Sequence, residues 1–410
     1  MLTPDDALNI ALKNNYDILL AMNDEDVAKR NNTAGNAGML PNLSLNASET
    51  YSLNNVDQKL STGIETNSPD ATTKNFNAGV ELNWTLFDGG KMFVTKNKLN
   101  EIQALGEIQY KDKVLQTIYD VIVAYYDVVR QKQQLASIDE VISSNQERVN
   151  ILTTSFKAGL SPKTNLLQAQ IDLNVYKEAA INQQAAILAS KRILNRLLSR
   201  EVNTLFEVAD SIPLNYTPDK NELSQKLYSS NTGVLSLQKQ VDLASLSLKE
   251  FKTLLLPKIY FNAGYDFLQT DNTTGTILMN KAYGPQLGGT ISIPLYQSGN
   301  ALRQIETAKI QLQSTEYSLE RIKLQVNTEL QNALTEYESQ QQMLEIEKVN
   351  SAMAKENLDI SMQRLRLGQT TSLELHQAQE SYVGSYTRLI NFEFNLKVAE
   401  TKLKQLLSSL

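Results

Sequence analysis

The chain has 410 residues, of which 20% are charged, and its formal net charge is −6. This length exceeds what one ordinary core needs, so we expect more than one structural region. The mild acidity, without a basic stripe, argues against nucleic acid as a partner, and the absence of cysteine excludes disulfides and thiolate chemistry.

The N-terminal segment MLTPDDALNIAL has neither the basic region nor the apolar core of a signal peptide. No run of about 18 apolar residues exists that would cross a membrane as a helix, and no N-terminal cysteine is present that would carry a lipid anchor. If the protein is exported, we expect this sequence to be its mature form. A helical segment is expected to lead to Pro41.

Two strands are predicted next, over 42–53 and 75–87. Apolar side chains occupy every second position of the latter, and polar residues or glycine fill the positions between them. This period of two is typical of a strand with one apolar and one wet face. The apolar positions are Phe76, Ala78, Val80, Leu82, Trp84 and Leu86. The polar segment 54–74, which joins the two strands, is expected to be a loop.

A long helical hairpin is predicted after these strands. Its first helix covers 91–158, interrupted only by Gly106, and its second helix returns after the tip. A segment with prolines and many polar residues, 199–222, then separates a first repeat, 1–198, from a second, 223–410. We expect this segment to be a partly irregular connector packed outside the helices.

The second repeat has the same plan as the first. The segment 366–379, RLGQTTSLELHQAQ, repeats 157–170, KAGLSPKTNLLQAQ, so that Gly368 corresponds to Gly159. The same offset places LYQSG at 295–299 over LFDGG at 86–90. Because these similarities keep their order along the chain, they indicate an internal duplication.

Strands are predicted in the second repeat over 257–268 and 283–296, with a polar loop over 269–282. A helix is predicted through 301–367, which contains neither glycine nor proline. Apolar residues of this helix and of the last helix recur in steps of three and four, the spacing of coiled-coil pairs. They are Leu319, Ile322, Val326, Leu330, Ala333 and Tyr337, and Leu389, Phe392, Leu396, Ala399, Leu403 and Leu406.

The four strands admit two arrangements. One is an ordinary soluble sandwich, but helices that pack on each other leave no second layer to cover the sheet. The other is a membrane barrel, because each strand is close to the roughly 9–11 residues that cross a bilayer. Four strands are too few to close a barrel, and an open edge in lipid leaves backbone groups unsatisfied, so this arrangement requires several chains to share one barrel.

The duplicated plan resembles the TolC-like family of outer-membrane efflux and secretion channels. The resemblance covers nearly the whole chain and includes the doubled strand exit, Leu86–Gly90 and Leu295–Gly299, and the doubled hairpin tip, Phe156–Gln170 and Leu365–Gln379. It implies an α+β membrane protein of a Gram-negative bacterium. In that family three chains build a twelve-stranded transmembrane β-barrel, continued by a coiled-coil helical barrel that forms a tunnel through the periplasm.

The resemblance also implies which side of each strand contacts lipid. The residues Phe76, Val80, Leu82, Trp84 and Leu86 would face the outer membrane, and the wet face would line an aqueous exit. The loops 54–74 and 269–282 would be extracellular, and Trp84 and Tyr283 are candidates for the interfacial aromatic girdle.

Adaptor proteins of the periplasm dock at the hairpin tips in this family. The corresponding residues are Ala158, Gly159, Leu160 and Ser161 in the first repeat and Leu367, Gly368, Gln369 and Thr370 in the second. The first tip is close to the family's Val-Gly-Leu, whereas the second departs from the family's pattern at Gln369.

Family members also narrow the tunnel just beyond the second tip. By position, the candidates in this chain are Glu374 and Gln377, and the neutral Asn165 is the counterpart of Glu374 in the first repeat. Three copies of Glu374 around one axis would focus a negative potential.

No catalytic, metal or cofactor site is expected. His376 is the single histidine, which excludes multi-histidine metal sites, and no Walker loop, HExxH or GxSxG motif is present. The simplest interpretation of His376 is a polar residue near the tip, and a pH-sensing role is the alternative.

The sequence therefore predicts a passive trimeric exit duct of a tripartite efflux pump or a type I secretion system. Docking of a periplasmic adaptor and an inner-membrane transporter of the RND or ABC type would open its periplasmic tip. The alternative is a periplasmic coiled-coil scaffold or adaptor protein without channel activity.

Overall fold

The computed structural model describes residues 1–410, which divide into two compact units. The helical unit comprises Met1–Glu25, Glu107–Leu237 and Ser318–Leu410, and the strand unit comprises Asp26–Gly106 and Gln238–Tyr317. Each unit contains segments from both halves of the sequence, as expected of a duplicated protein.

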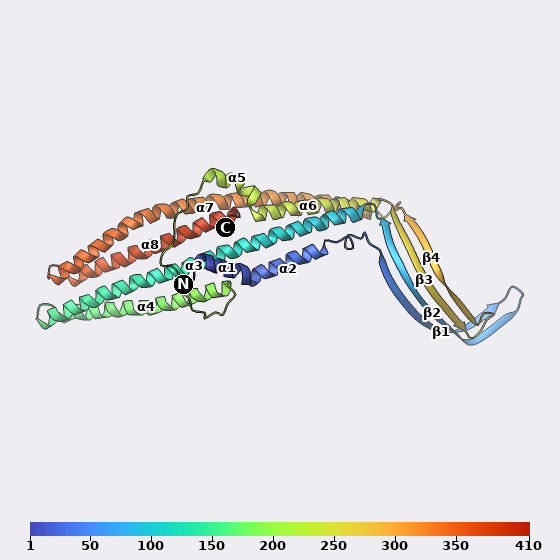
Figure 1. Ribbon diagram of the computed structural model, residues 1–410, viewed down its shortest axis with the longest axis horizontal. Coiled ribbons are helices and arrows are strands. Elements are labelled where there is room, and N and C mark those ends of the chain that lie inside the picture. Colours follow the sequence, from blue (N-terminus) through green and yellow to red (C-terminus); the bar gives the residue numbers. More distant parts are fainter. The chain divides into compact units, whose positions relative to one another are not determined.

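Apart from one 3₁₀ turn in the second half, the two halves contain the same elements in the same order (Figure 1). In the first half they are α1 (Pro4–Asn14), α2 (Tyr16–Asn31), β1 (Asn42–Lys59), β2 (Glu65–Phe87), α3 (Lys91–Lys157) and α4 (Lys163–Leu197). In the second half they are α5 (Lys220–Ser230), α6 (Thr232–Lys252), the 3₁₀ turn η1 (Thr253–Leu255), β3 (Lys258–Asn272), β4 (Met279–Ser292), α7 (Asn300–Arg366) and α8 (Ser372–Leu406).

The long helices of the two halves have equal lengths. Both α3 and α7 contain 67 residues, and both α4 and α8 contain 35. The predicted internal duplication is thus confirmed. Gly106, the one glycine in this otherwise glycine- and proline-free segment, does not break the predicted helix, because α3 continues through it. One glycine costs a helix only about 1 kcal/mol relative to alanine, which a helix of this length absorbs.

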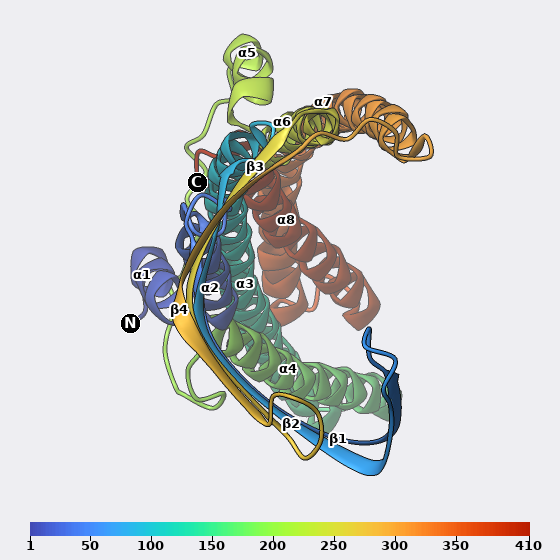
Figure 2. The same ribbon diagram turned by 90° about the vertical axis from the view of Figure 1, so that its right-hand side faces the viewer.

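The strands form one antiparallel sheet in the order β1-β2-β3-β4, which curves strongly (Figure 2). The register places apolar side chains beside one another on one face, since Val80 pairs with Leu45 and with Tyr265. The opposite face carries polar side chains that bond across strands. For example, the Thr270 hydroxyl donates to Asn75 Oδ1 at 2.8 Å.

The predicted loops 54–74 and 269–282 were wrong, because most of both segments is strand. β1 continues to Lys59 and β2 begins at Glu65, while β3 and β4 are joined by the short turn 273–278. The alternation of apolar and polar residues ends before the strands do, so that pattern does not reveal their polar ends. The expected end of the fourth strand at 296 was also wrong, since β4 stops at Ser292, ahead of Pro294, which has no N–H to donate.

The two halves of the chain bury equivalent cores in the helical unit. In the first, α1, α3 and α4 bury residues such as Ala11, Tyr125 and Leu194. In the second, α5, α6, α7 and α8 bury Leu227, Leu330 and Leu403, among others. The predicted heptad positions of α7 and α8 lie in this second core, which confirms that these helices pack as a pair.

The connector 199–219 contains no helix or strand, and α5 begins at Lys220. Its apolar residues Val208 and Ile212 are buried in the first core, with Phe206 packed against them. The N-terminus is tied to this segment, because the Leu2 amide donates to the Glu207 carbonyl at 2.7 Å.

A buried asparagine marks the same joint in each half. Asn15 separates α1 from α2 and donates through Nδ2 to the Leu197 carbonyl at 2.7 Å. Asn231 separates α5 from α6 and donates to the Leu406 carbonyl at 2.9 Å, while its Oδ1 accepts from the Val234 amide. Each asparagine therefore begins one helix and satisfies a carbonyl at the end of another.

The substitution Asn231→Ala should lower the free energy of unfolding by about 1–2 kcal/mol, because it leaves a buried carbonyl and a helix N-terminus without partners. The measurement is the thermal unfolding of the purified protein followed by circular dichroism. Asn395→Ala is the matched control, since Asn395 is exposed on α8. Equal melting temperatures for the two variants would contradict this role of Asn231.

Candidate functional site

Both hairpin tips close in the same way. The chain leaves α3 at Gly159 and α7 at Gly368, whose φ angles of 74° and 68° lie in the left-handed region that glycine adopts without strain. At the first tip the Leu160 amide donates to the Ser155 carbonyl at 2.8 Å, and at the second the Gln369 amide donates to Arg364 at the same distance. These bonds satisfy the last carbonyls of the two helices.

The tips present apolar side chains to solvent. Leu160 is 83% exposed and Leu367 is 70% exposed. Of the other residues predicted at the tips, Ala158, Gly159, Gly368 and Gln369 are exposed, whereas Ser161 and Thr370 are half-buried. Each tip therefore carries one strongly exposed leucine.

The proposed constriction residues lie just beyond the tips. Glu374 is exposed in the first turn of α8, where its amide donates to the N-cap Thr371 and its carboxylate accepts from the Thr370 hydroxyl. Gln377 is exposed on the same helix, and Asn165 is half-buried in α4. Glu374 thus contacts Thr370, and Gln377 follows it one helical turn later on α8.

A buried charged cluster above the tips was missed by the sequence interpretation. Arg148 of α3 is 1% exposed, and its guanidinium donates through Nη1 to Asp172 Oδ2 of α4 at 2.8 Å. It also donates through Nη2 to Ser372 Oγ of α8 at 2.7 Å. Gln168 donates to the other oxygen of Asp172 at 2.8 Å, so the ion pair is almost fully satisfied.

His376 lies beside this cluster. Its Nδ1 is 3.4 Å from Asp172 Oδ2 and makes no hydrogen bond. This position agrees with the expected polar residue near the tip. It also places the Asp172 carboxylate next to the imidazole.

The cluster had a signal in the sequence. The buried positions Val141, Asn145, Arg148 and Leu152 follow heptad steps of four, three and four. Two polar residues therefore occupy core positions of an otherwise apolar seam. Buried polar residues need hydrogen-bonding partners, and the periodicity of apolar residues does not reveal those partners.

Further polar contacts join the two hairpins. Glu140 of α3 contacts Lys355 of α7 and accepts from the Tyr382 hydroxyl of α8 at 2.7 Å. Tyr176 of α4 donates to Glu380 of α8, also at 2.7 Å. Gln379 of α8 donates to Ser144 of α3 at 3.0 Å.

Burial alone raises the pKa of Glu140, but hydrogen bonds from Lys355 and Tyr382 bring that pKa below its usual value. The pKa of Tyr176 is raised mainly by burial and, to a smaller extent, by the hydrogen bond to Glu380. Burial and the bond to Glu140 likewise raise the pKa of Tyr382. At neutral pH the tyrosines are therefore neutral donors and Glu140 is an ionised acceptor.

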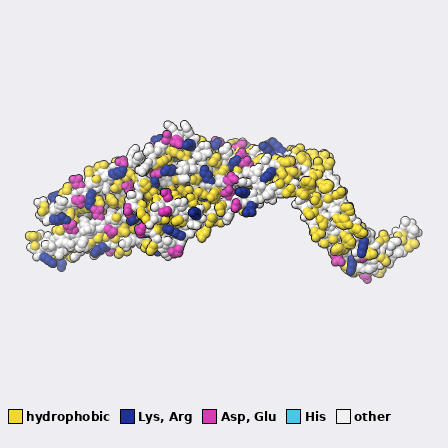
Figure 3. Space-filling view, in the orientation of Figure 1, with side chains coloured by type: hydrophobic (Ala, Val, Ile, Leu, Met, Phe, Trp, Pro, Cys, Tyr) yellow, Lys and Arg dark blue, Asp and Glu magenta, His cyan; other side chains and the backbone are white.

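The faces of the sheet form the second candidate site. Phe76, Val80, Trp84 and Leu86 are exposed on the apolar face, and Leu82 lies between them. Hydrophobic side chains cover much of the sheet in the space-filling view, where charged ones are few (Figure 3). The indole N–H of Trp84 donates to the Met39 carbonyl at 3.0 Å, which satisfies its polar group beside this apolar surface.

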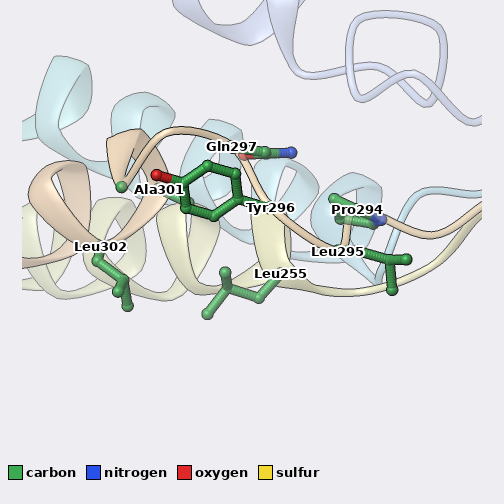
Figure 4. A pocket seen from close by; sticks show the side chains of 8 residues that line it. Leu255, Pro294, Leu295, Tyr296, Gln297, Ala301 and Leu302 are labelled. Carbon is green, nitrogen blue, oxygen red and sulfur yellow. The ribbon is translucent and has the colours of Figure 1, made fainter.

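A small apolar cavity lies where β4 leads into α7 (Figure 4). Its volume is about 120 Å³, and its lining includes Leu255, Leu295 and Tyr296 but no charged side chain. This is below the range of about 300–1,000 Å³ for small-molecule sites. Leu295 and Tyr296 are 93% and 86% exposed, so this chain alone leaves them uncovered.

The structure contains no cluster of three or more metal-ligating side chains. None of its helices combines the length and the apolar character that spanning a membrane requires.

Replacing Arg148 should destabilise the helical unit. Arg148→Met leaves the Asp172 carboxylate buried without its cation, which should lower the free energy of unfolding by about 3–5 kcal/mol. The double variant Arg148→Met/Asp172→Leu removes both charges and should recover most of this loss. Denaturant unfolding monitored by circular dichroism gives the comparison, and a double variant no more stable than Arg148→Met would contradict the paired role.

The chain matches the family model described as "Outer membrane efflux protein" over residues 7–200 and 223–409. It is 24% identical over 333 residues to the outer membrane efflux protein BepC of Brucella suis, covering 78% of this chain and 69% of BepC. It is 20% identical over 409 residues to the alkaline protease secretion protein AprF of Pseudomonas aeruginosa, covering 97% of this chain and 83% of AprF.

The fold is similar to the crystal structure of the Campylobacter jejuni CmeC outer membrane channel, with a TM-score of 0.81 and 16% identity. That likeness covers 99% of this chain and 85% of CmeC. The predicted TolC-like fold is thus confirmed, with long helices and four antiparallel strands built on a duplicated repeat. The chain belongs to the outer membrane efflux protein family, and it is an efflux or secretion channel of the outer membrane with a periplasmic extension, not an enzyme.

Proposed function

We propose that three copies of this chain assemble into one passive exit duct. The observation that carries the proposal is a sheet with one apolar face and two open edges, β1 and β4. An open edge in lipid leaves backbone N–H and C=O groups unsatisfied, so β1 of one copy must pair with β4 of the next. Three copies with four strands each supply twelve strands, a number within the range of membrane barrels.

The apolar face of the sheet would contact lipid and the polar face would line the exit. Charged lumen-facing groups are few on the polar face, which carries mainly asparagine, threonine and glycine. Such a wall suits water and diverse solutes. Leu295 and Tyr296, which the single chain leaves exposed, would be covered by a neighbouring copy.

The hairpin tips would dock a periplasmic adaptor, through which an inner-membrane transporter of the RND or ABC type supplies the energy. The exposed Leu160 and Leu367 support this proposal, because they offer apolar contact area at both tips. The relatives named for efflux and for protease secretion are consistent with either a tripartite pump or a type I secretion system.

The closed tunnel would narrow at Glu374 and Gln377 of α8, with Asn165 of α4 at the equivalent place in the first repeat. The exposure of Glu374 and its position one helical turn from the tip support this assignment. Three copies of the carboxylate would attract cations and repel anions at the narrowest point.

The two faces of β2 should respond differently to charge. Val80→Arg would place a cation on the lipid side and should destabilise the assembled barrel by about 2–4 kcal/mol. Asn77→Arg is the matched control, because Asn77 lies on the opposite face of the same strand. The readout is the fraction of chains in oligomers that survive detergent on a gel without heating. Equal losses for both variants would refute the assigned faces.

If Glu374 and Gln377 form the constriction, replacing them should increase the current through the channel. In planar lipid bilayers, the double variant Glu374→Ala/Gln377→Ala should conduct several-fold more current than the unsubstituted protein and should lose cation block, because the narrowest point is widened and discharged. No conductance from either protein would count against the channel. A protein that washes off membranes with carbonate would instead favour the periplasmic scaffold.

A further inference from the structure

We propose that the helix end of the sheet, where β2 leads into α3 and β4 leads into α7, binds an anionic phospholipid of the periplasmic leaflet. Lys249, Lys252 and Arg303 would contact the phosphate of its headgroup, and its acyl chains would lie on the apolar surface beside them. The proposal rests on the proposed barrel, because it requires the apolar face of the sheet to be in lipid. All three cations belong to the strand unit.

Cationic residues are concentrated at the helix end of the sheet. The segments 88–98, 249–258 and 300–306 at this end contain seven lysine or arginine residues and three acidic ones. The segments 54–74 and 269–282 at the opposite end contain three cationic and four acidic residues. In Figure 3, dark blue side chains lie beside the hydrophobic sheet where the helices join it. A chain of net charge −6 is therefore locally positive at one end of its sheet.

Two lysines at this end have no acidic partner. Lys249 and Lys252 of α6 are exposed and form no ion pair. The acidic residue between them, Glu250, is already bound by Lys91 and Lys98 of α3, whose Nζ atoms lie 3.3 and 3.2 Å from its carboxylate. The two exposed ammonium groups are thus available to an anion from outside the chain.

The same two lysines lie on one helix face with an exposed leucine that borders the sheet. Lys252 has φ and ψ angles of −62° and −28°, so the chain passes from α6 into the turn η1 without leaving the helical conformation. Residues three apart are neighbours on such a surface, which aligns Lys249, Lys252 and Leu255. This stripe therefore changes from cationic to apolar as it approaches the strands.

Arg303 of α7 supplies the third cation. It is exposed, and together with Phe251 of α6 it lines a groove of about 260 Å³ between the two helices. Because Phe251 directly precedes Lys252, the guanidinium lies at the level of the two lysines. The acidic residue one turn further along α7, Glu306, is paired with Lys309 at 2.7 Å. Arg303 therefore has no carboxylate of its own.

The apolar surface beside these cations continues the apolar face of the sheet. Ile291 of β4 lies on that face, and Ile293 and Leu295 follow it at every second position. Figure 4 shows Leu295, Leu255 and Leu302 pointing to the same side of the joint between sheet and helices. All of these side chains are exposed. The apolar area thus extends from the strands to the first turn of α7.

A phospholipid matches this arrangement better than a free anion does. Its phosphate and its acyl chains meet at the edge of the hydrocarbon region, and here the cations meet the apolar surface at the edge of the sheet. Free phosphate would use the cationic part alone and would leave the leucines in water. A lipid of the outer leaflet would meet the opposite end of the sheet, where the cationic excess is absent.

The test compares two variants that lose the same charge. Lys249→Gln/Lys252→Gln alters the proposed site, and Lys163→Gln/Lys177→Gln, the matched control, removes two exposed and unpaired lysines of α4 in the helical unit. Each solubilised complex is incubated with equal amounts of phosphatidylglycerol and phosphatidylcholine of the same acyl chains, and is then washed with detergent. Native mass spectrometry counts the lipids of each kind that stay bound. A parallel sample contains inorganic phosphate as competitor.

The unsubstituted protein and the α4 control should retain phosphatidylglycerol in about tenfold excess over phosphatidylcholine. Lys249→Gln/Lys252→Gln should bring this ratio close to one, because two of the three cations near the headgroup are removed. Added salt should lower the excess in the unsubstituted protein, since it screens exposed charges. Inorganic phosphate at low concentration should leave the lipid bound.

The same ratio in all three proteins, or displacement of the lipid by inorganic phosphate, would overturn the proposal. Each sample is also run on a gel without heating to record its oligomers. A chain that forms no detergent-resistant oligomer would refute the proposed duct, and the lipid site with it. Intact oligomers with no preference for phosphatidylglycerol would refute the lipid site alone.

Discussion

The backbone hydrogen bonds of the sheet constrain everything else that this chain must do in a membrane. β2 and β3 are paired on both sides, whereas β1 and β4 each have one free edge. Water would satisfy a free edge in a soluble protein, but lipid offers no hydrogen bonds. Together with an apolar outer face, this requirement leaves closure with other copies as the arrangement that satisfies every backbone group. In the proposed assembly, the need for several copies follows from the number of strands in one chain.

The duplication repeats the same structural joints in both halves of the chain. Equivalent helices and equivalent asparagine joints, Asn15 and Asn231, repeat the same unit twice. The copies are not identical in detail, however. Arg148 and Asp172 form an ion pair within the first repeat, and Arg148 also donates to Ser372 of the second. The cluster therefore joins the two repeats and distinguishes the first from the second.

The sequence predicted the features that depend on periodicity. Alternation located the apolar part of each strand, and heptad steps located the packed faces of α7 and α8. It did not predict the polar ends of β1 and β2, because residues such as Asn54 and Thr66 form ladder pairs without any apolar signal. It also missed Arg148, since its partners Asp172 and Ser372 are distant in sequence and come together only in the fold. Contacts between copies lie beyond a single chain, so tip and constriction residues followed from family resemblance alone.

The most direct test of this account is the protein mass of the detergent-solubilised complex, corrected for bound detergent. A value near three times the 45.9 kDa of one chain is the expected result, because only a shared barrel satisfies both edges of the sheet. A stable particle of 45.9 kDa that needs no detergent would contradict the account, since the apolar face would then have to be covered by protein within one chain.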